Sequence, residues 1–248
     1  MSKLRVTIWN EYRHEKTDAA AKEIYPNGLH AVIGEYLTAQ GDMEVTLAAL
    51  DDPEQGLPEE VLNNTDVLVW WGHMAHAEVD DALVERIRKR VYLGQMGLVT
   101  LHSGHHSKVF RSIIGTTGHL SWGREQKEIV WCVNPTHPIA AGIPDHFLIE
   151  SEELYAEPFF VGEPDETVFT SWFEDGFVLR SGMVFKRAAG KIFYFQPGHE
   201  LCRSFYNENV LKVIHNGIHY VKPVCTGQEV LDTAPHWQFS ARDEFENQ

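Results

Sequence analysis

The stretch Gly97-Leu-Val-Thr-Leu-His-Ser-Gly-His-His-Ser-Lys-Val-Phe110 decides the fold of this chain. It begins as a short apolar run, passes through a glycine-containing turn and continues as the first turn of a helix. In α/β proteins such a turn lifts one side chain above the carboxyl edge of the sheet, where many enzymes carry a nucleophile. The raised position holds His102, followed by His105 and His106. Imidazole ligates metals and transfers protons near neutral pH, but it is a less usual nucleophile than Cys or Ser.

The chain before and around this turn alternates strand and helix patterns. Apolar runs and helical spacing predict strands at 4–9, 44–50, 66–71 and 97–102, and helices at 28–40, 79–93 and 106–114. The run over 66–71 is apolar almost throughout, as expected for a central parallel strand covered on both faces. We expect a loop between Asn10 and Pro26. The alternation predicts an α/β fold with a doubly wound, mainly parallel, flavodoxin-like sheet and right-handed crossovers.

The second half of the chain has a different texture. Closely spaced strand-like segments occupy 128–133, 145–151, 167–173, 177–186 and 191–195, and a closing helix is predicted at 207–221. We expect antiparallel additions to the sheet, with Lys191 to Phe195 as the last core strand. Residues 1–221 are therefore predicted to form a single α/β domain. Residues 222–248 are acidic and carry Trp237, Phe239 and Phe245, and we expect this tail to act as an oligomerisation arm of a homo-oligomer.

Composition excludes several classes of partner. The chain has 248 residues, 43% of them hydrophobic, and a formal charge of -15 from 36 acidic and 21 basic side chains. This balance argues against a nucleic acid or an anionic membrane as partner. Cys132, Cys202 and Cys225 are too widely spaced for a zinc or redox motif, which favours a reducing cytoplasm. There is no signal-peptide pattern and no apolar run of about 20 residues, and no nucleotide cofactor is expected.

Histidines recur where the predicted parallel strands end. Ligands of open α/β sheets bind outside the carboxyl ends of the strands, so these loops are expected to meet. His73, His102 and His199 follow three such strands. Zinc sites use three or four His, Cys or carboxylate ligands, with one position open when the site is catalytic. We therefore predict that these three histidines hold a divalent metal such as zinc.

Further candidates come from carboxylate and aromatic side chains. Glu153 lies in Glu150-Ser-Glu-Glu-Leu-Tyr155, at the end of a predicted strand. A partly buried carboxylate can have its pKa tuned toward neutrality, so we predict Glu153 as a general acid/base beside His102 and His199. Sugars favour aromatic faces and polar clamps. The predicted substrate-binding residues are Trp122, Arg124, Tyr155 and Arg180.

The turn resembles the elbow of class I glutamine amidotransferases, whose pattern runs roughly Leu-Gly-Ile-Cys-x-Gly. In this register His102 stands at the cysteine position, and Pro197-Gly-His-Glu200 resembles the His-x-Glu segment that completes the triad. Without a thiolate there is no glutaminyl-thioester route. Glutaminase activity is therefore not expected, and Cys202, the sequence neighbour of His199, is predicted to lie on the wrong element.

A closer resemblance is to the trehalose-utilisation (ThuA-like) family, which shares this amidotransferase-like fold. The matching pieces extend in order across residues 4–221: Val67–His73, Gly97–His102, Asn134–Ile139, Glu152–Tyr155, Val168–Trp172 and Gly190–His199. The resemblance implies a role in the use of trehalose or related disaccharides, with a small-molecule sugar or keto-sugar as substrate. We expect a hydrolase or isomerase; the alternative is a non-catalytic carbohydrate-binding or regulatory module.

Overall fold

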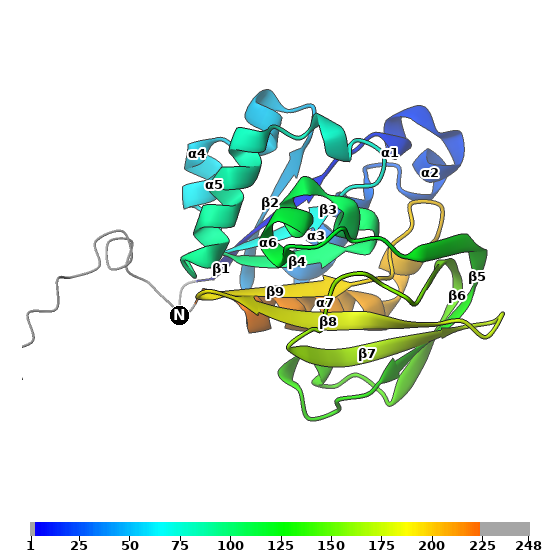
Figure 1. Ribbon diagram of the computed structural model, residues 1–248. Helices are drawn as coiled ribbons and strands as arrows, with labels where there is room; N and C mark the ends of the chain where they lie inside the picture. The colour runs from blue at the N-terminus through cyan, green and yellow to red at the C-terminus, as the bar shows by residue number, and fades with distance from the viewer. Residues whose placement is uncertain (1–2, 224–248) are drawn as a thin grey trace, which may run out of the picture.

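The computed structural model describes residues 3–223 as one nine-stranded sheet with helices on both faces (Figure 1). The order across the sheet is β2-β1-β3-β4-β9-β8-β7-β5-β6. The strands are β1 (Leu4–Asn10), β2 (Met43–Ala49), β3 (Val67–Trp71), β4 (Gly97–Leu101), β5 (Ser121–Cys132), β6 (His146–Ala156), β7 (Glu166–Phe173), β8 (Val178–Arg187) and β9 (Gly190–Phe195). The predicted tail lies outside the described residues from position 224 onward.

Within residues 3–223, seven α-helices accompany these strands. They are α1 (His14–Thr17), α2 (Ala19–Ile24), α3 (Leu29–Gln40), α4 (Glu59–Asn63), α5 (Asp81–Tyr92), α6 (Lys108–Ile114) and α7 (Glu208–Val221). The loop expected between Asn10 and Pro26 is wrong, because α1 and α2 occupy much of it. The Asp18 carboxylate accepts hydrogen bonds from the backbone N–H groups of Ala20 and Ala21, and this N-cap starts α2 on an alanine-rich run.

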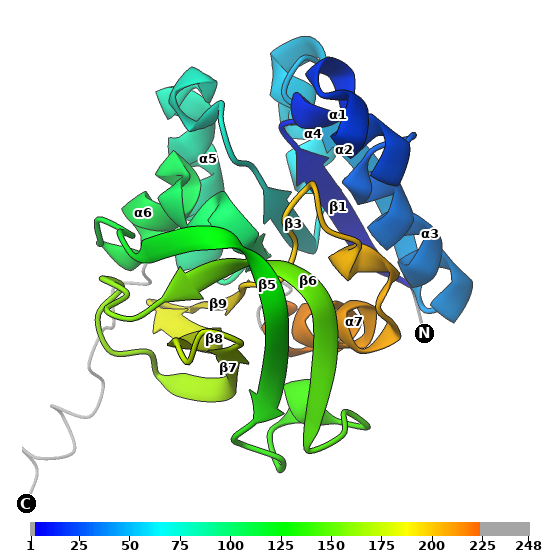
Figure 2. The ribbon, with the colours of Figure 1, turned by 90° about the vertical axis from the view of Figure 1, so that its right-hand side faces the viewer.

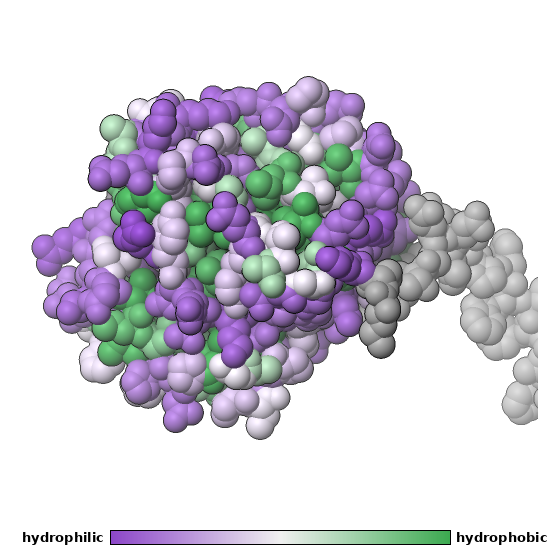
Figure 3. Space-filling view, turned by 180° about the vertical axis from the view of Figure 1, so that it is seen from behind, coloured by the Kyte–Doolittle hydropathy of each residue, from purple (hydrophilic) through white to green (hydrophobic). Residues whose placement is uncertain are grey.

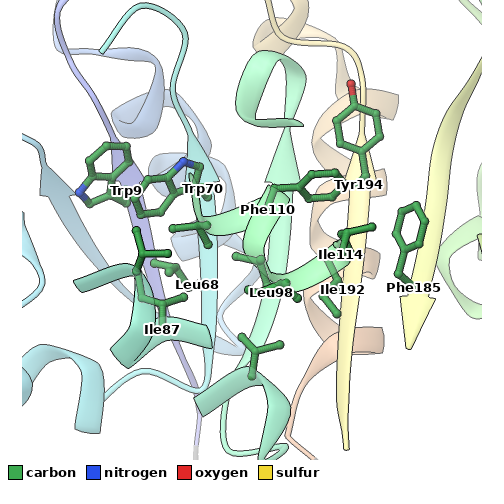
Figure 4. Packing of buried hydrophobic residues seen from close by; sticks show 14 of the residues in the cluster. Trp9, Leu68, Trp70, Ile87, Leu98, Phe110, Ile114, Phe185, Ile192 and Tyr194 are labelled. Carbon is green, nitrogen blue, oxygen red and sulfur yellow. The ribbon is translucent and has the colours of Figure 1, made fainter. Parts of the chain in front are cut away.

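The parallel half of the sheet confirms the predicted doubly wound fold. Strands β2, β1, β3, β4 and β9 run parallel, and α5 and α6 pack on one face while α3 and α7 pack on the other. Alternate residues of each strand face opposite cores. On the face of α5 and α6, Trp9 stacks on Trp70 with ring centroids 3.8 Å apart, and Phe110 packs near Tyr194 (Figure 4). Helices cover both faces of the parallel sheet, so we look for a ligand-binding site at the ends of its strands.

The antiparallel half curls back over the carboxyl edge of the parallel strands. Strands β8, β7, β5 and β6 extend the sheet beyond β9, and Figure 2 shows β5 and β6 arching beside the loop that follows β9. The β5–β6 ladder is irregular between Gly123 and Glu125 and again between Gln126 and Glu128. Such bulges bend a strand and increase its twist. The bend brings the end of β6 against the elbow after β4.

The surface carries mixed polarity. On the side seen from behind, hydrophilic side chains surround smaller hydrophobic areas (Figure 3). Within residues 3–223, no helix combines the length and the apolar character that crossing a bilayer requires.

Glu128 on β5 makes stability depend on pH in an unusual direction. Its carboxyl is fully buried, and burial together with the charge of Glu152 raises its pKa well above 4.5. The folded state therefore holds a proton that the unfolded state loses above about pH 4.5, so stability from this group falls as the pH rises. We expect Glu128→Gln to be more stable than the wild type at about pH 8 and to lose less stability between about pH 5 and pH 8. Urea denaturation at both pH values measures the free energy of unfolding. An equal change of this free energy with pH in the wild type and the variant would contradict the prediction.

Candidate functional site

The elbow after β4 has the geometry that the sequence predicts. His102 has a φ of 49°, a left-handed conformation that costs a non-glycine residue about 1–3 kcal/mol. A 3-10 turn over His102–His106 follows, and the Ser107 hydroxyl caps α6 by accepting from the N–H of Phe110. The turn is tight, because a Cβ on Gly104 would lie 2.7 Å from the Thr100 methyl carbon. The side chain of His102 is thereby fixed above the sheet.

The His102 ring is engaged by the protein on both sides. Its Nδ1 lies 3.0 Å from the carbonyl oxygen of Gln196, which only accepts hydrogen bonds, so Nδ1 carries a proton. Its Nε2 lies 3.1 Å from Oε2 of Glu153 and 3.2 Å from the Tyr155 hydroxyl. Burial favours the neutral ring, but the hydrogen bond to Glu153 and the charge of Glu152 outweigh it and raise the pKa of His102. With 0% exposure, His102 holds Glu153 in place and offers no free nitrogen to a metal.

The elements above the elbow bring together two of the three predicted metal ligands, with Glu153 in the place of His102. One ligand atom each from His73, Glu153 and His199 lies within 4.8 Å of the others. Burial and the nearby His102 lower the pKa of His199, which favours its neutral ring. Its Nδ1 accepts the N–H of Leu201 at 3.3 Å, so the proton of the neutral ring is on Nε2, and a metal would have to displace it there. Although burial opposes it, the hydrogen bond from His102 lowers the pKa of Glu153 and keeps it ionised.

Glu200 and His14 form a second layer that was not among the predicted site residues. Oε2 of Glu200 lies 2.9 Å from Nδ1 of His73, and Oε1 lies 3.2 Å from Nε2 of His14. Against the effect of burial, the hydrogen bond from His73 lowers the pKa of Glu200 to about 2, so this carboxylate accepts the Nδ1 proton. This hydrogen bond leaves Nε2 as the nitrogen of His73 that could bind a metal. Their positions in the sequence could have indicated them, because Glu200 directly follows His199 and His14 lies shortly after the first strand.

Two further buried carboxylates hold the histidine loops by their backbones. Glu11 accepts hydrogen bonds from the N–H groups of His73, Met74 and Ala75 at 2.7–3.0 Å. Glu152 accepts from the N–H groups of Gly198 at 2.7 Å and His199 at 3.0 Å, and from the Ser204 hydroxyl. Both carboxylates are buried, so the interactions take place away from water. Glu11 thereby holds the loop after β3 to the end of β1, and Glu152 holds the loop after β9 to β6.

A cavity of about 120 Å³ opens beside His73 and Glu153. Trp122 stands at its rim with 73% of its surface exposed. Burial lowers the pKa of His106, and its Nε2 finds no hydrogen-bond partner among residues 3–223. The lining residues are His73, Ser103, His105, His106, Leu120, Trp122, Glu153 and Tyr155.

Two of the predicted substrate-binding residues lie apart from this cavity. The Arg180 guanidinium is bound by the Glu157 carboxylate at 2.7 Å and by the carbonyl of Phe159, which gives it a structural partner. The Arg124 side chain is 81% exposed and lies 3.8 Å from Asp175. Neither arginine lines the cavity. Arg180 is paired with Glu157 instead, and Arg124 lies near Asp175.

Cys202 does not replace the missing nucleophile. Its Sγ lies 3.9 Å from Nδ1 of His199, on the side of the ring opposite the Nε2 that faces Glu153. Burial and the charge of Glu152 raise the pKa of this thiol, so it stays protonated. A protonated thiol is a poor nucleophile.

The fold and this edge define an amidotransferase-like α/β protein whose elbow carries histidine in the place of cysteine. The family model described as "Trehalose utilisation" (ThuA) matches residues 5–221. The chain therefore belongs to the ThuA family. A search among curated proteins gave no match.

Solved structures agree with the fold. A ThuA-like protein from Parabacteroides merdae is 14% identical, with 92% of this chain and 94% of that one covered and a TM-score of 0.67. One from Bacteroides uniformis is 16% identical, with 87% and 90% covered and a TM-score of 0.62. A glutamine amidotransferase from Thermotoga maritima is 13% identical, with 89% and 98% covered and a TM-score of 0.56. At these identities the likeness establishes the fold alone.

The role of Glu152 can be tested by stability. Glu152→Ala leaves the N–H groups of Glu153, Gly198 and His199 and the Ser204 hydroxyl without their acceptor, so we expect unfolding to become easier by about 3 kcal/mol. Glu150→Ala is the matched control two residues away, because Glu150 is exposed and pairs only loosely with Lys127. The control should change stability by less than about 0.5 kcal/mol. Equal losses for the two variants in chemical denaturation would contradict this assignment.

Proposed function

We propose that the protein acts on a sugar or keto-sugar, as a hydrolase or isomerase, with a divalent cation such as zinc held by His73, Glu153 and His199. Membership of the trehalose-utilisation family supports the role in sugar metabolism. The single observation that carries the chemistry is the convergence of these three ligand atoms within 4.8 Å at the carboxyl edge. This is the edge where open α/β sheets bind their ligands.

The residues present fit a cation of this kind. Two neutral imidazoles and one carboxylate are a common ligand set of catalytic zinc sites, which leave a further position for water or substrate. Ligands of such sites are usually oriented by outer partners, and two of the three have one here. Glu200 binds Nδ1 of His73, and His102 binds Oε2 of Glu153. His73 and Glu153 also line the cavity, so the open position would face the substrate.

The surrounding side chains divide the remaining work. A bound cation would polarise a carbonyl oxygen or activate water, so no covalent intermediate on the protein is required. His106 lines the cavity and burial lowers its pKa, so its neutral ring is our candidate for exchanging a proton with a substrate hydroxyl. Trp122 offers an exposed indole face at the rim, suited to the apolar face of a sugar ring.

Metal analysis of the purified full chain tests this proposal. We expect His73→Ala and His199→Ala each to hold one equivalent of zinc less than the wild type and to lose turnover of a keto-disaccharide by at least about 100-fold. His146→Ala is the control, since this exposed histidine lies against Trp131 and apart from the site. Unchanged metal content in both site variants would overturn the metal site. If the two site variants lose metal but the wild type itself shows no turnover, the result would favour the non-catalytic binding module.

Trp122 allows a separate test of sugar binding. Trp122→Ala removes the indole at the rim, and we expect KM for the sugar to rise by about tenfold, equivalent to about 1.4 kcal/mol. Trp172→Ala is the matched control, because Trp172 is also half-exposed but lies on the outer face of β7. Equal effects of the two substitutions on KM would remove Trp122 from the site.

A further inference from the structure

Another group of side chains that could hold a metal ion lies at the opposite end of the sheet. Asp42 directly precedes β2, at the amino end of the parallel strands, and His215 and His219 lie on α7. The site at the elbow lies at the carboxyl ends of the same strands. The two groups share no residue, and neither the sugar chemistry nor the comparisons use this one.

The geometry of this group is compact. Nε2 of His215 lies 3.0 Å and Nε2 of His219 lies 2.8 Å from the same oxygen, Oδ2 of Asp42. The two rings are 4.7 Å apart between centroids, because residues four apart share one face of a helix. The three side chains are 18–41% exposed, so an ion can reach them from solvent.

The ligand atoms are held by two separate elements. Helix α7 fixes the spacing of the two imidazoles, and its other face is buried against the sheet. The backbone of Asp42 is anchored, since its carbonyl accepts the N–H of Leu4 at 3.1 Å. Two imidazole nitrogens and one carboxylate oxygen match the preferences of zinc and of neighbouring borderline-soft cations, and not those of magnesium or calcium.

We propose that Asp42, His215 and His219 form a second site for a divalent cation such as zinc. A cation there joins the start of β2 to α7, two elements that are distant in the sequence. Because it binds the folded chain and not the unfolded one, it stabilises the packing of α7 on the sheet. Without a cation the same three side chains form the hydrogen bonds described above.

Zinc titration of the full chain by calorimetry tests this site. The wild type is expected to bind one zinc equivalent more than His219→Ala, and Asp42→Asn, which keeps the shape of the side chain, should weaken this site by at least about tenfold. His146→Ala is the matched control and should titrate as the wild type does. Circular dichroism of each variant verifies that the fold is kept.

The result is separable from that for the carboxyl-edge site. His73→Ala should keep the equivalent that His219→Ala loses, whatever the fate of the sugar chemistry. If wild type, His219→Ala and Asp42→Asn give the same isotherm, the surface site is overturned. If zinc binds with the same low affinity to the wild type and to all the variants, His146→Ala included, it is an adventitious ion only and the proposal fails.

Discussion

The site depends on two buried carboxylates that bind backbone rather than substrate. Glu11 collects three N–H groups of the loop after β3, and Glu152 collects two from the loop after β9 and a hydroxyl. Removing a carboxylate from water is costly unless hydrogen bonds compensate it. These loops supply those bonds, and in return they are fixed. The histidines of these two loops are therefore held close together at the carboxyl edge.

The elbow keeps its backbone but not the chemistry for which such elbows are known. His102 sits in the strained, left-handed position of a nucleophile, yet its ring turns into the protein and binds Gln196 and Glu153. The carboxylate that faces the histidines at this edge is contributed by β6, whose pairing with the bulged β5 places Glu153 beside His102.

Local patterns were enough to predict most of the fold. The apolar runs located the parallel strands to within a residue or two, and the strand–turn–helix at His102 placed the site at the carboxyl edge. The first loop was wrong, because the cap formed by Asp18 decides α2 and not the average polarity of the segment.

The sequence predicted where the site lies in the fold but not which side chains contact one another there. The sequence brought His73 and His199 to the same edge, but it could not show that His102 has both nitrogens occupied or that Glu153 stands in its place. These contacts depend on bulges in β5 and β6, which are properties of strand pairing over long range. For the same reason the pairing of Arg180 with Glu157 could not be foreseen from residues that are 23 positions apart.

X-ray absorption at the zinc edge tests the central claim most directly, in a His219→Ala background that removes the surface site. The account predicts a shell of nitrogen and oxygen donors at about 2.0–2.2 Å containing two imidazoles, and one imidazole fewer when His199 is also replaced by Ala. A spectrum in which the number of imidazoles does not change on replacing His199, or a chain that retains no zinc, would contradict it.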